Sequence, residues 1–158
     1  MILVTTGASG APFDRLLAVF ERFDTDEEVV VQHGPSAIRP PHATCVDFVP
    51  FAELGELVAR ARVVVAHAGV GSILLCASKG RVPIVVPRLA RHDEAVDDHQ
   101  VFLARRLAAS GRVVCADDPE ELPRLVAAGT AASDSVLHSS SLTEDLRNYV
   151  DAVLASSP

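Results

Sequence analysis

The chain has 158 residues and a formal net charge of −7, from 14 Lys and Arg against 21 Asp and Glu. This length suits one domain with a sizeable buried core. The acidic balance provides no positive field to gather a polyanion, and only 4% of the residues are aromatic, which disfavours nucleic acid as the main partner.

The composition predicts a soluble, cytoplasmic protein. No apolar run approaches the roughly 18 residues of a membrane span, and the first residues lack the basic segment of a secretory signal. Cys45, Cys76 and Cys115 stand in apolar surroundings. Their odd number and setting indicate reduced thiols in the core rather than a disulfide framework.

Short apolar runs rich in β-branched residues predict strands that are covered on both faces. They span residues 2–5, 28–32, 45–49, 63–66, 83–86 and 113–116. Helical spacing of apolar residues begins at Phe13 and returns in segments 54–61, 70–77, 96–109, 119–127 and 142–154. Segment 33–43 contains three prolines and predicts a loop.

Strands that alternate with helices predict an α/β fold with a doubly wound parallel sheet, in the Rossmann-like manner. The helix near residue 119 has its own start signal, because Asp118 precedes Pro119 and Glu121 follows. An Ala/Ser/Gly-rich linker from Ala127 to Ser141 separates it from the last predicted helix.

Two glycine loops point to a ligand site. Open α/β sheets bind ligands at the carboxyl ends of strands where the strand order reverses, which in a 3-2-1-4-5-6 order lies between strands one and four. Strand one ends in residues 5–10 (TTGASG), and strand four ends in residues 67–72 (HAGVGS). Glycines allow close backbone approach and helix starts favour anions, so the two loops predict a diphosphate site.

Each loop also has a purely structural interpretation. Tight turns between strands and helices use glycine in many folds without a ligand. His67 and Ser72 favour a site in the second loop because both can donate hydrogen bonds to phosphate oxygens, although His67 could equally be a satisfied structural group.

Other ligand classes have weaker support. An NAD site is disfavoured because Leu74 stands where the dinucleotide fingerprint requires Gly or Ala, and neither strand two nor strand five ends in the acid that binds ribose. Asp24 and Asp26 resemble a metal-holding acidic pair, but they precede strand two, at the opposite end of the sheet, and are expected to be an exposed turn.

Three ordered motifs carry a resemblance to a known family. They are His67-Ala68-Gly69-x-Gly71-Ser72-Ile73, Gly80-x-x-Pro83-Ile84-Val85-x-Pro87-Arg88 and Glu94-x-x-x-Asp98-His99-Gln100. Together they resemble the glycosyltransferase family 28 C-terminal domain, the nucleotide-sugar-binding half of GT-B enzymes. The start of the chain is Ile2-Leu3-Val4-Thr5-x-Gly7, followed by Pro12-Phe13-Asp14-Arg15-Leu16. It is similar to the small soluble catalytic subunits of two-component exopolysaccharide and dolichol-linked GlcNAc transferases.

The resemblance implies a nucleotide-sugar-binding domain over residues 1–128, with 129–158 as linker and C-terminal helix. It implies that His67, as the catalytic residue, contacts phosphate together with Gly71 and Ser72, and that Gly7 approaches from strand one. Glu94, Asp98 and Gln100 would orient the sugar. The rest of the implied nucleotide-sugar-binding set is Gly69, Arg88 and His99.

One position departs from the family pattern. Many relatives place an acid that grips the ribose hydroxyls eight residues after the histidine, where this chain has Leu75. On a helix, Leu75 would lie one turn beyond Gly71 on the same face, so an apolar group replaces an acceptor. We expect this replacement to affect the affinity for the nucleotide or the choice of base.

The resemblance implies half of an enzyme. The expected function is the donor-binding subunit of an inverting glycosyltransferase that uses a UDP-sugar without metal or cofactor. A membrane-anchored partner would present a lipid-linked or polysaccharide acceptor, with residues 130–158 either docking on that partner or covering this domain's own sheet. The alternative is a non-catalytic nucleotide-binding or interaction module on the same fold.

Overall fold

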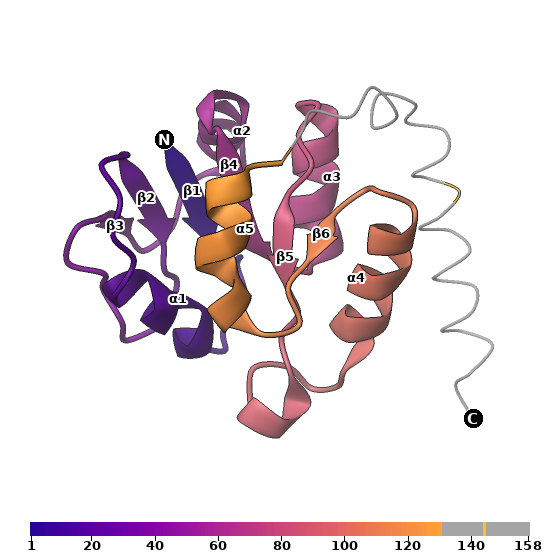
Figure 1. Cartoon of the computed structure of the whole chain (residues 1–158). Coiled ribbons are helices and arrows are strands. Elements are labelled where there is room, and N and C mark those ends of the chain that lie inside the picture. Colours follow the sequence, from indigo (N-terminus) through magenta and orange to yellow (C-terminus); the bar gives the residue numbers. More distant parts are fainter. Residues whose placement is uncertain (131–143, 145–158) are drawn as a thin grey trace.

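The computed structural model describes residues 1–130 and residue 144, and its centre is one parallel sheet (Figure 1). The strand order is β3-β2-β1-β4-β5-β6, which confirms the doubly wound fold and places the reversal between β1 and β4. The strands are β1 (Ile2–Thr5), β2 (Val29–Gln32), β3 (Thr44–Val46), β4 (Val63–His67), β5 (Ile84–Val86) and β6 (Val114–Cys115).

Helices cover both faces of the sheet. One face carries α1 (Asp14–Glu21) and α5 (Leu122–Ala128), and Leu16, Leu17 and Val126 pack there against β1 and β4. The other face carries α2 (Phe51–Arg60), α3 (Val70–Ser78) and α4 (His99–Ala109). Because both faces are covered, the central strands are apolar and almost wholly buried, as their unbroken apolar runs predicted.

The connection between β2 and β3 is a loop, as its prolines predicted. The third strand is shorter than predicted: it ends at Val46, and Phe48 and Val49 belong to the loop before α2. The residue after Val46 is Asp47, whose exposed carboxylate lies 2.7 Å from Nε2 of the buried His33.

Two helix starts differ from the periodicity. Helix α4 begins at His99 rather than near residue 96; Asp98 is its N-cap residue but makes no capping hydrogen bond through its side chain, and Val96 is fully exposed. The segment from Pro119 to Glu121 is one 3-10 turn before α5. Its predicted start is confirmed, since the Glu120 N–H donates to Asp118 (3.0 Å) and the Asp118 N–H donates to Glu121 (3.3 Å).

The cysteines are free but are not all core residues. Cys76 is buried, whereas Cys45 and Cys115 are only half-buried, because β3 and β6 are the two edge strands of the sheet. Apart from Glu144, the predicted helix over 142–154 lies outside the described residues.

The described helices are short. None of those within residues 1–130 combines the length and the apolar character that crossing a bilayer requires.

Candidate functional site

The two glycine loops meet around the imidazole of His67, at the carboxyl edge of β1 and β4. A Cβ atom on Gly7 would lie 2.2 Å from Cε1 of His67, and one on Gly69 would lie 2.1 Å from its Nε2. No side chain fits in either place, so both glycines are required by this close approach. Gly7 also has a φ of +79°, which favours glycine independently of the histidine.

His67 is a neutral base in this setting. Its Nδ1 atom is buried and has no hydrogen-bond partner among the described residues. Burial and the nearby positive charge of Arg88 lower the pKa of His67 from 6.5 to about 4. No described residue satisfies the Nδ1 atom, and in this respect the ring differs from the satisfied structural histidine considered from the sequence.

Helix α3 begins directly beside this histidine and leaves its first turn uncapped. Gly69 is the N-cap residue and offers no side chain, and the first turn carries no acidic residue. The first N–H groups of an α-helix have no partner within the helix, so this end of α3 carries a partial positive charge. Ser72 lies in the same turn. Such an end is suited to hold an anion.

A cavity of about 330 Å³ lies against this helix end. Of the predicted site residues it is lined by Gly7, His67, Gly71 and Ser72, from both loops. Its volume is at the lower end of the roughly 300–1,000 Å³ that is usual for small-molecule sites. The remaining lining residues are Ala8, Gln32, Phe48, Val49, Phe51, Leu54 and Leu75.

The sequence missed most of this second group. Phe48 and Val49 were assigned to a strand, yet they lie in the loop after β3, and Phe51 and Leu54 begin α2. The available signal was their position after a strand, since the carboxyl ends of parallel strands share one edge of the sheet.

Arg88 lies at the same edge but inside the protein. It is 1% exposed and its guanidinium packs 4.6 Å from the Phe13 ring centroid. Its Nη atoms donate at 2.8–3.1 Å to the carbonyl oxygens of Thr6, Ala11, Pro12 and Glu94. This side chain offers no surface to a ligand, so its observed role is to join the loop after β1 to the loop after β5, not direct contact with a donor.

Glu94 is held in a similar way. It is 4% exposed, and both of its carboxylate oxygens accept from Arg15 at 2.8 and 2.9 Å. The Leu89 N–H donates to the same carboxylate at 3.0 Å, and Arg15 also donates to the carbonyl oxygen of Pro87. Glu94 thus anchors the loop between β5 and α4 to α1, and orienting a sugar would need this ion pair to open.

The other predicted sugar contacts lie at the start of α4. Asp98 accepts from the Ala90 N–H at 2.9 Å, and Gln100 accepts from the Arg88 N–H at 3.2 Å. His99 contacts Asp97, whose pKa is lowered because its carboxylate accepts from the backbone and side chain of His99. Direct contact of these residues with a sugar stays a prediction.

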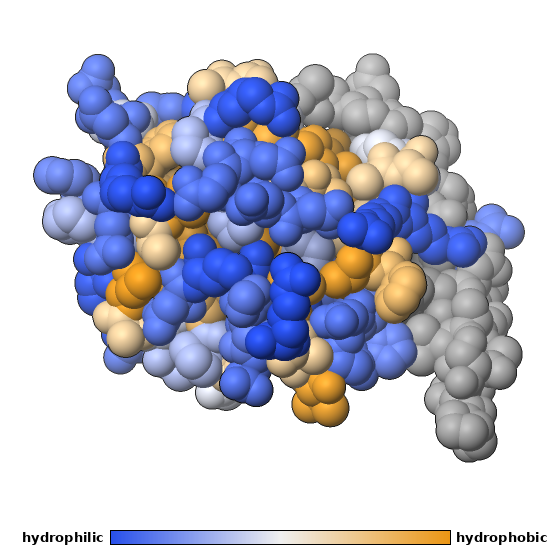
Figure 2. Space-filling view, turned by 60° about the horizontal axis from the view of Figure 1, so that its bottom comes forward, coloured by the Kyte–Doolittle hydropathy of each residue, from blue (hydrophilic) through white to orange (hydrophobic). Residues whose placement is uncertain are grey.

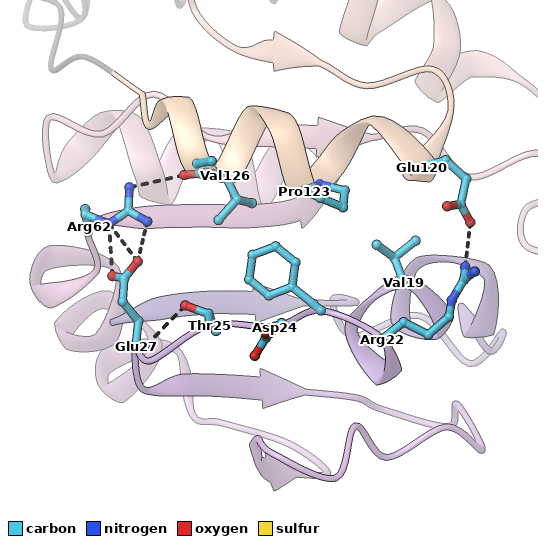
Figure 3. Close-up of a pocket in the computed structure, with 11 residues that line it drawn as sticks. Val19, Arg22, Asp24, Thr25, Glu27, Arg62, Glu120, Pro123 and Val126 are labelled. Atoms are coloured by element: carbon cyan, nitrogen blue, oxygen red, sulfur yellow. Dashed lines mark hydrogen bonds and ion pairs between the residues drawn. The ribbon is translucent and has the colours of Figure 1, made fainter.

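A larger cavity of about 530 Å³ lies along α5, between that helix and the segment that follows α1, and reaches the amino edge of the sheet (Figure 3). Four of its charged groups form two pairs: Arg62 binds Glu27 at one end, and Arg22 binds Glu120 at 2.7 Å at the other. Arg62 and the chain's amino group lower the pKa of Glu27 to about 2. Its lining residues include no histidine, cysteine or serine, so it has no group comparable to His67.

Asp24 and Asp26 are exposed, as expected, near that amino edge. Within the part of the chain that the structure describes, no cluster of three or more His, Cys, Asp or Glu side chains could hold a metal ion.

Solved structures with a similar fold are glycosyltransferases. They include the calicheamicin glycosyltransferase CalG4, with 20% identity over 98% of this chain and 39% of that chain and a TM-score of 0.58. MurG of Acinetobacter baumannii has 23% identity over 80% of this chain and 40% of its own, with a TM-score of 0.57. SnogD from Streptomyces nogalater has 20% identity over 99% of this chain and 43% of its own, with a TM-score of 0.54. The chain spans less than half the length of these proteins, and among curated proteins no sequence matches it.

The family assignment comes from the sequence model. The model of the glycosyltransferase family 28 C-terminal domain matches residues 1–150. The sheet order, the wound topology and the similar structures agree with it. The chain therefore belongs to the glycosyltransferase family 28 C-terminal domain family, and its fold is the C-terminal half of a GT-B enzyme.

Proposed function

We propose that this chain is the donor-binding catalytic subunit of an inverting glycosyltransferase that takes its sugar from a UDP-sugar. The observation that carries the proposal is the closure of two glycine loops on a neutral, unsatisfied His67 at the uncapped start of α3. Those groups are suited to the diphosphate, and the cavity beside them is suited to the nucleoside. One of the similar structures, VinC, is a complex with dTDP, also a nucleoside diphosphate.

The chemistry that this arrangement supports is stabilisation of the leaving group. Negative charge develops on the diphosphate as the glycosidic bond breaks. The N–H groups of the first turn of α3, together with the hydroxyl of Ser72 and the imidazole of His67, are fixed before the reaction and offset that charge. The proposal therefore requires neither a metal nor a cofactor.

The acceptor would come from a second polypeptide. Because the chain corresponds to about 40% of the similar structures, the group that deprotonates the acceptor hydroxyl is proposed to lie on a membrane-anchored partner. That partner would present a lipid-linked or polysaccharide acceptor, as in exopolysaccharide synthesis, and the complex would work at the cytoplasmic face of the membrane.

A non-catalytic nucleotide-binding module is the second candidate. Leu75 favours it, because the cavity wall at this position is apolar and provides no acceptor for a sugar hydroxyl. The two candidates differ in one property: an enzyme must recognise the sugar of the donor, whereas a nucleotide-binding module need not.

Calorimetric titration with UDP, UDP-GlcNAc, UDP-glucose and NAD tests the proposal. We expect UDP to bind, one UDP-sugar to bind more tightly than UDP, and NAD to bind less tightly. His67→Ala should weaken UDP binding by about 1.5–3 kcal/mol, the usual contribution of a hydrogen bond to a charged group.

His42→Ala is the matched control, because His42 is exposed and lies before β3, at the amino edge of the sheet. Equal affinity for UDP and every UDP-sugar would favour the module. Unchanged UDP affinity in His67→Ala would remove the histidine from the site.

A further inference from the structure

The cavity beside His67 has an apolar wall. Leu75 follows Gly71 by one turn on α3, and both residues line the cavity. The other apolar side chains of the wall come from the loop after β3 and from α2, and they are Phe48, Val49, Phe51 and Leu54.

This wall is fixed rather than adaptable at Leu75. The residue is 6% exposed and belongs to the apolar cluster that contains Val58 and Cys76. Its Cδ1 atom lies 3.6 Å from the position that a Cβ on Gly55 would take, so α2 and α3 are in close contact there. A ligand must therefore accept an apolar surface at this point.

Polar partners near the wall are already engaged. Gln32 is 2% exposed; its Oε1 accepts from the Thr5 hydroxyl at 2.5 Å, and its Nε2 donates to the Gly7 carbonyl at 3.5 Å. The lining residues include no carboxylate, and His67 and Ser72 stand at the helix start, where the diphosphate is proposed to bind. A hydroxyl that enters the wall loses water without gaining an acceptor.

We propose that Leu75 makes the donor site indifferent to the 2′ hydroxyl of ribose, so that deoxyribonucleoside diphosphates bind with an affinity similar to or higher than that of ribonucleoside diphosphates. This inference rests on the proposed function, because it requires a diphosphate at the start of α3 and a nucleoside in the cavity. It widens the donor class from UDP-sugars to donors that carry a deoxyribose.

The test compares UDP with 2′-deoxy-UDP on the full chain by calorimetry, since the two ligands differ only in that hydroxyl. The expected affinity of 2′-deoxy-UDP ranges from about threefold below that of UDP to about tenfold above it. A preference for UDP of more than about threefold overturns the inference and leaves the proposed function intact. Failure of both ligands to bind overturns both.

Leu75→Glu tests the position itself. A carboxylate there would be a hydroxyl acceptor, and the variant should favour UDP over 2′-deoxy-UDP by about tenfold more than the original chain does. Leu75→Met keeps the wall apolar and should leave the ratio unchanged. An unchanged ratio in a folded Leu75→Glu variant would show that residue 75 does not face the ribose, which overturns the inference.

Burying a carboxylate can prevent folding. If Leu75→Glu does not fold, Leu75→Gln replaces it, because the amide oxygen is also an acceptor and carries no charge. Without either variant, a preference for UDP of more than about threefold on the unmodified chain still overturns the inference.

Discussion

Gly71 and Gly69 occupy the same turn, yet they are glycine for different reasons. A Cβ on Gly69 would collide with His67, whereas one on Gly71 would meet nothing within 4 Å. The protein itself therefore does not require glycine at position 71. The free space beside it is the space that the proposed diphosphate would fill, so position 71 can separate ligand binding from stability.

Replacing Gly71 with alanine should raise stability and weaken nucleotide binding. Alanine is favoured over glycine within a helix by up to about 1 kcal/mol, while the new methyl group would obstruct the N–H groups of the first turn. Thermal unfolding should show a higher Tm, and calorimetry should show UDP affinity reduced by at least about tenfold. Ser78→Ala, at the far end of α3, is the control and should bind UDP normally. Normal binding by Gly71→Ala would place the diphosphate elsewhere.

The buried imidazole of His67 predicts a pH dependence of stability. Its folded pKa of about 4 lies below the 6.5 of an unperturbed histidine, so between these values the unfolded chain binds the proton more strongly. The free energy of unfolding should therefore fall by up to about 3 kcal/mol as the pH drops from 6.5 to 4, and this contribution should be constant above pH 6.5.

Urea unfolding of the original chain and of His67→Gln between pH 4.5 and 7.5 measures this contribution. The difference between the two unfolding free energies contains the contribution of residue 67 and not that of the carboxylates, which both proteins share. Glu27 is one such carboxylate: its lowered pKa stabilises the fold above pH 4.5, and this stabilisation is lost as the pH falls below that value. Parallel pH profiles for the two proteins would contradict the burial of a neutral imidazole.

At the scale of elements, α1 is tied to the loop between β5 and α4 by one ion pair. Arg15 on α1 donates to both oxygens of Glu94, and the side chain of Glu94 is 5% exposed. Buried pairs are costly to break, because the remaining charge has no partner.

Arg15→Met should therefore destabilise the protein by about 3 kcal/mol, and Arg15→Met combined with Glu94→Met should recover part of this loss. Chemical denaturation measures both values. Hydrogen exchange at the Leu89 amide, which donates to Glu94, should be faster in the single variant. If the double variant is as unstable as the sum of its parts, the pair is not coupled as the distances indicate.

The elements themselves were largely readable from the sequence. Fully buried parallel strands produce the unbroken apolar runs, and their alternation with helices determines the wound order. Boundaries were less predictable. Asp47, after β3, contacts His33, and Asp98, before α4, accepts from the Ala90 amide, and both contacts depend on the folded chain.

The site was half predictable for the same reason. Each glycine loop, like His67, is a signal within one short segment, but the residues that line the cavity come from four segments far apart in sequence. The burial of Arg88 could not be predicted from the sequence, because the four carbonyl oxygens that it binds come from two loops.

At the scale of the whole molecule, the carboxyl edge of the sheet exposes apolar side chains. Figure 2 brings this edge forward and shows apolar areas scattered among charged ones. Several large apolar side chains of the described residues are exposed in the segments at that edge, with exposures of 64% for Phe48, 68% for Phe51, 101% for Val96 and 68% for Phe102. Exposed apolar groups around a site are typical of surfaces that bind another protein.

If a partner completes the enzyme at this edge, the purified chain should bind UDP and yet transfer no sugar to a lipid-linked acceptor, and membranes that contain the partner should restore transfer. Phe102→Asp should abolish that restoration while leaving UDP affinity unchanged, because Phe102 lies in the first turn of α4, outside the cavity, where an acid is compatible with the helix. Ala128→Asp, on α5 of the opposite face of the sheet, is the matched control. Radiolabelled sugar in the lipid fraction measures transfer. Efficient transfer by the isolated chain would mean that the acceptor site and the base both lie within these 158 residues.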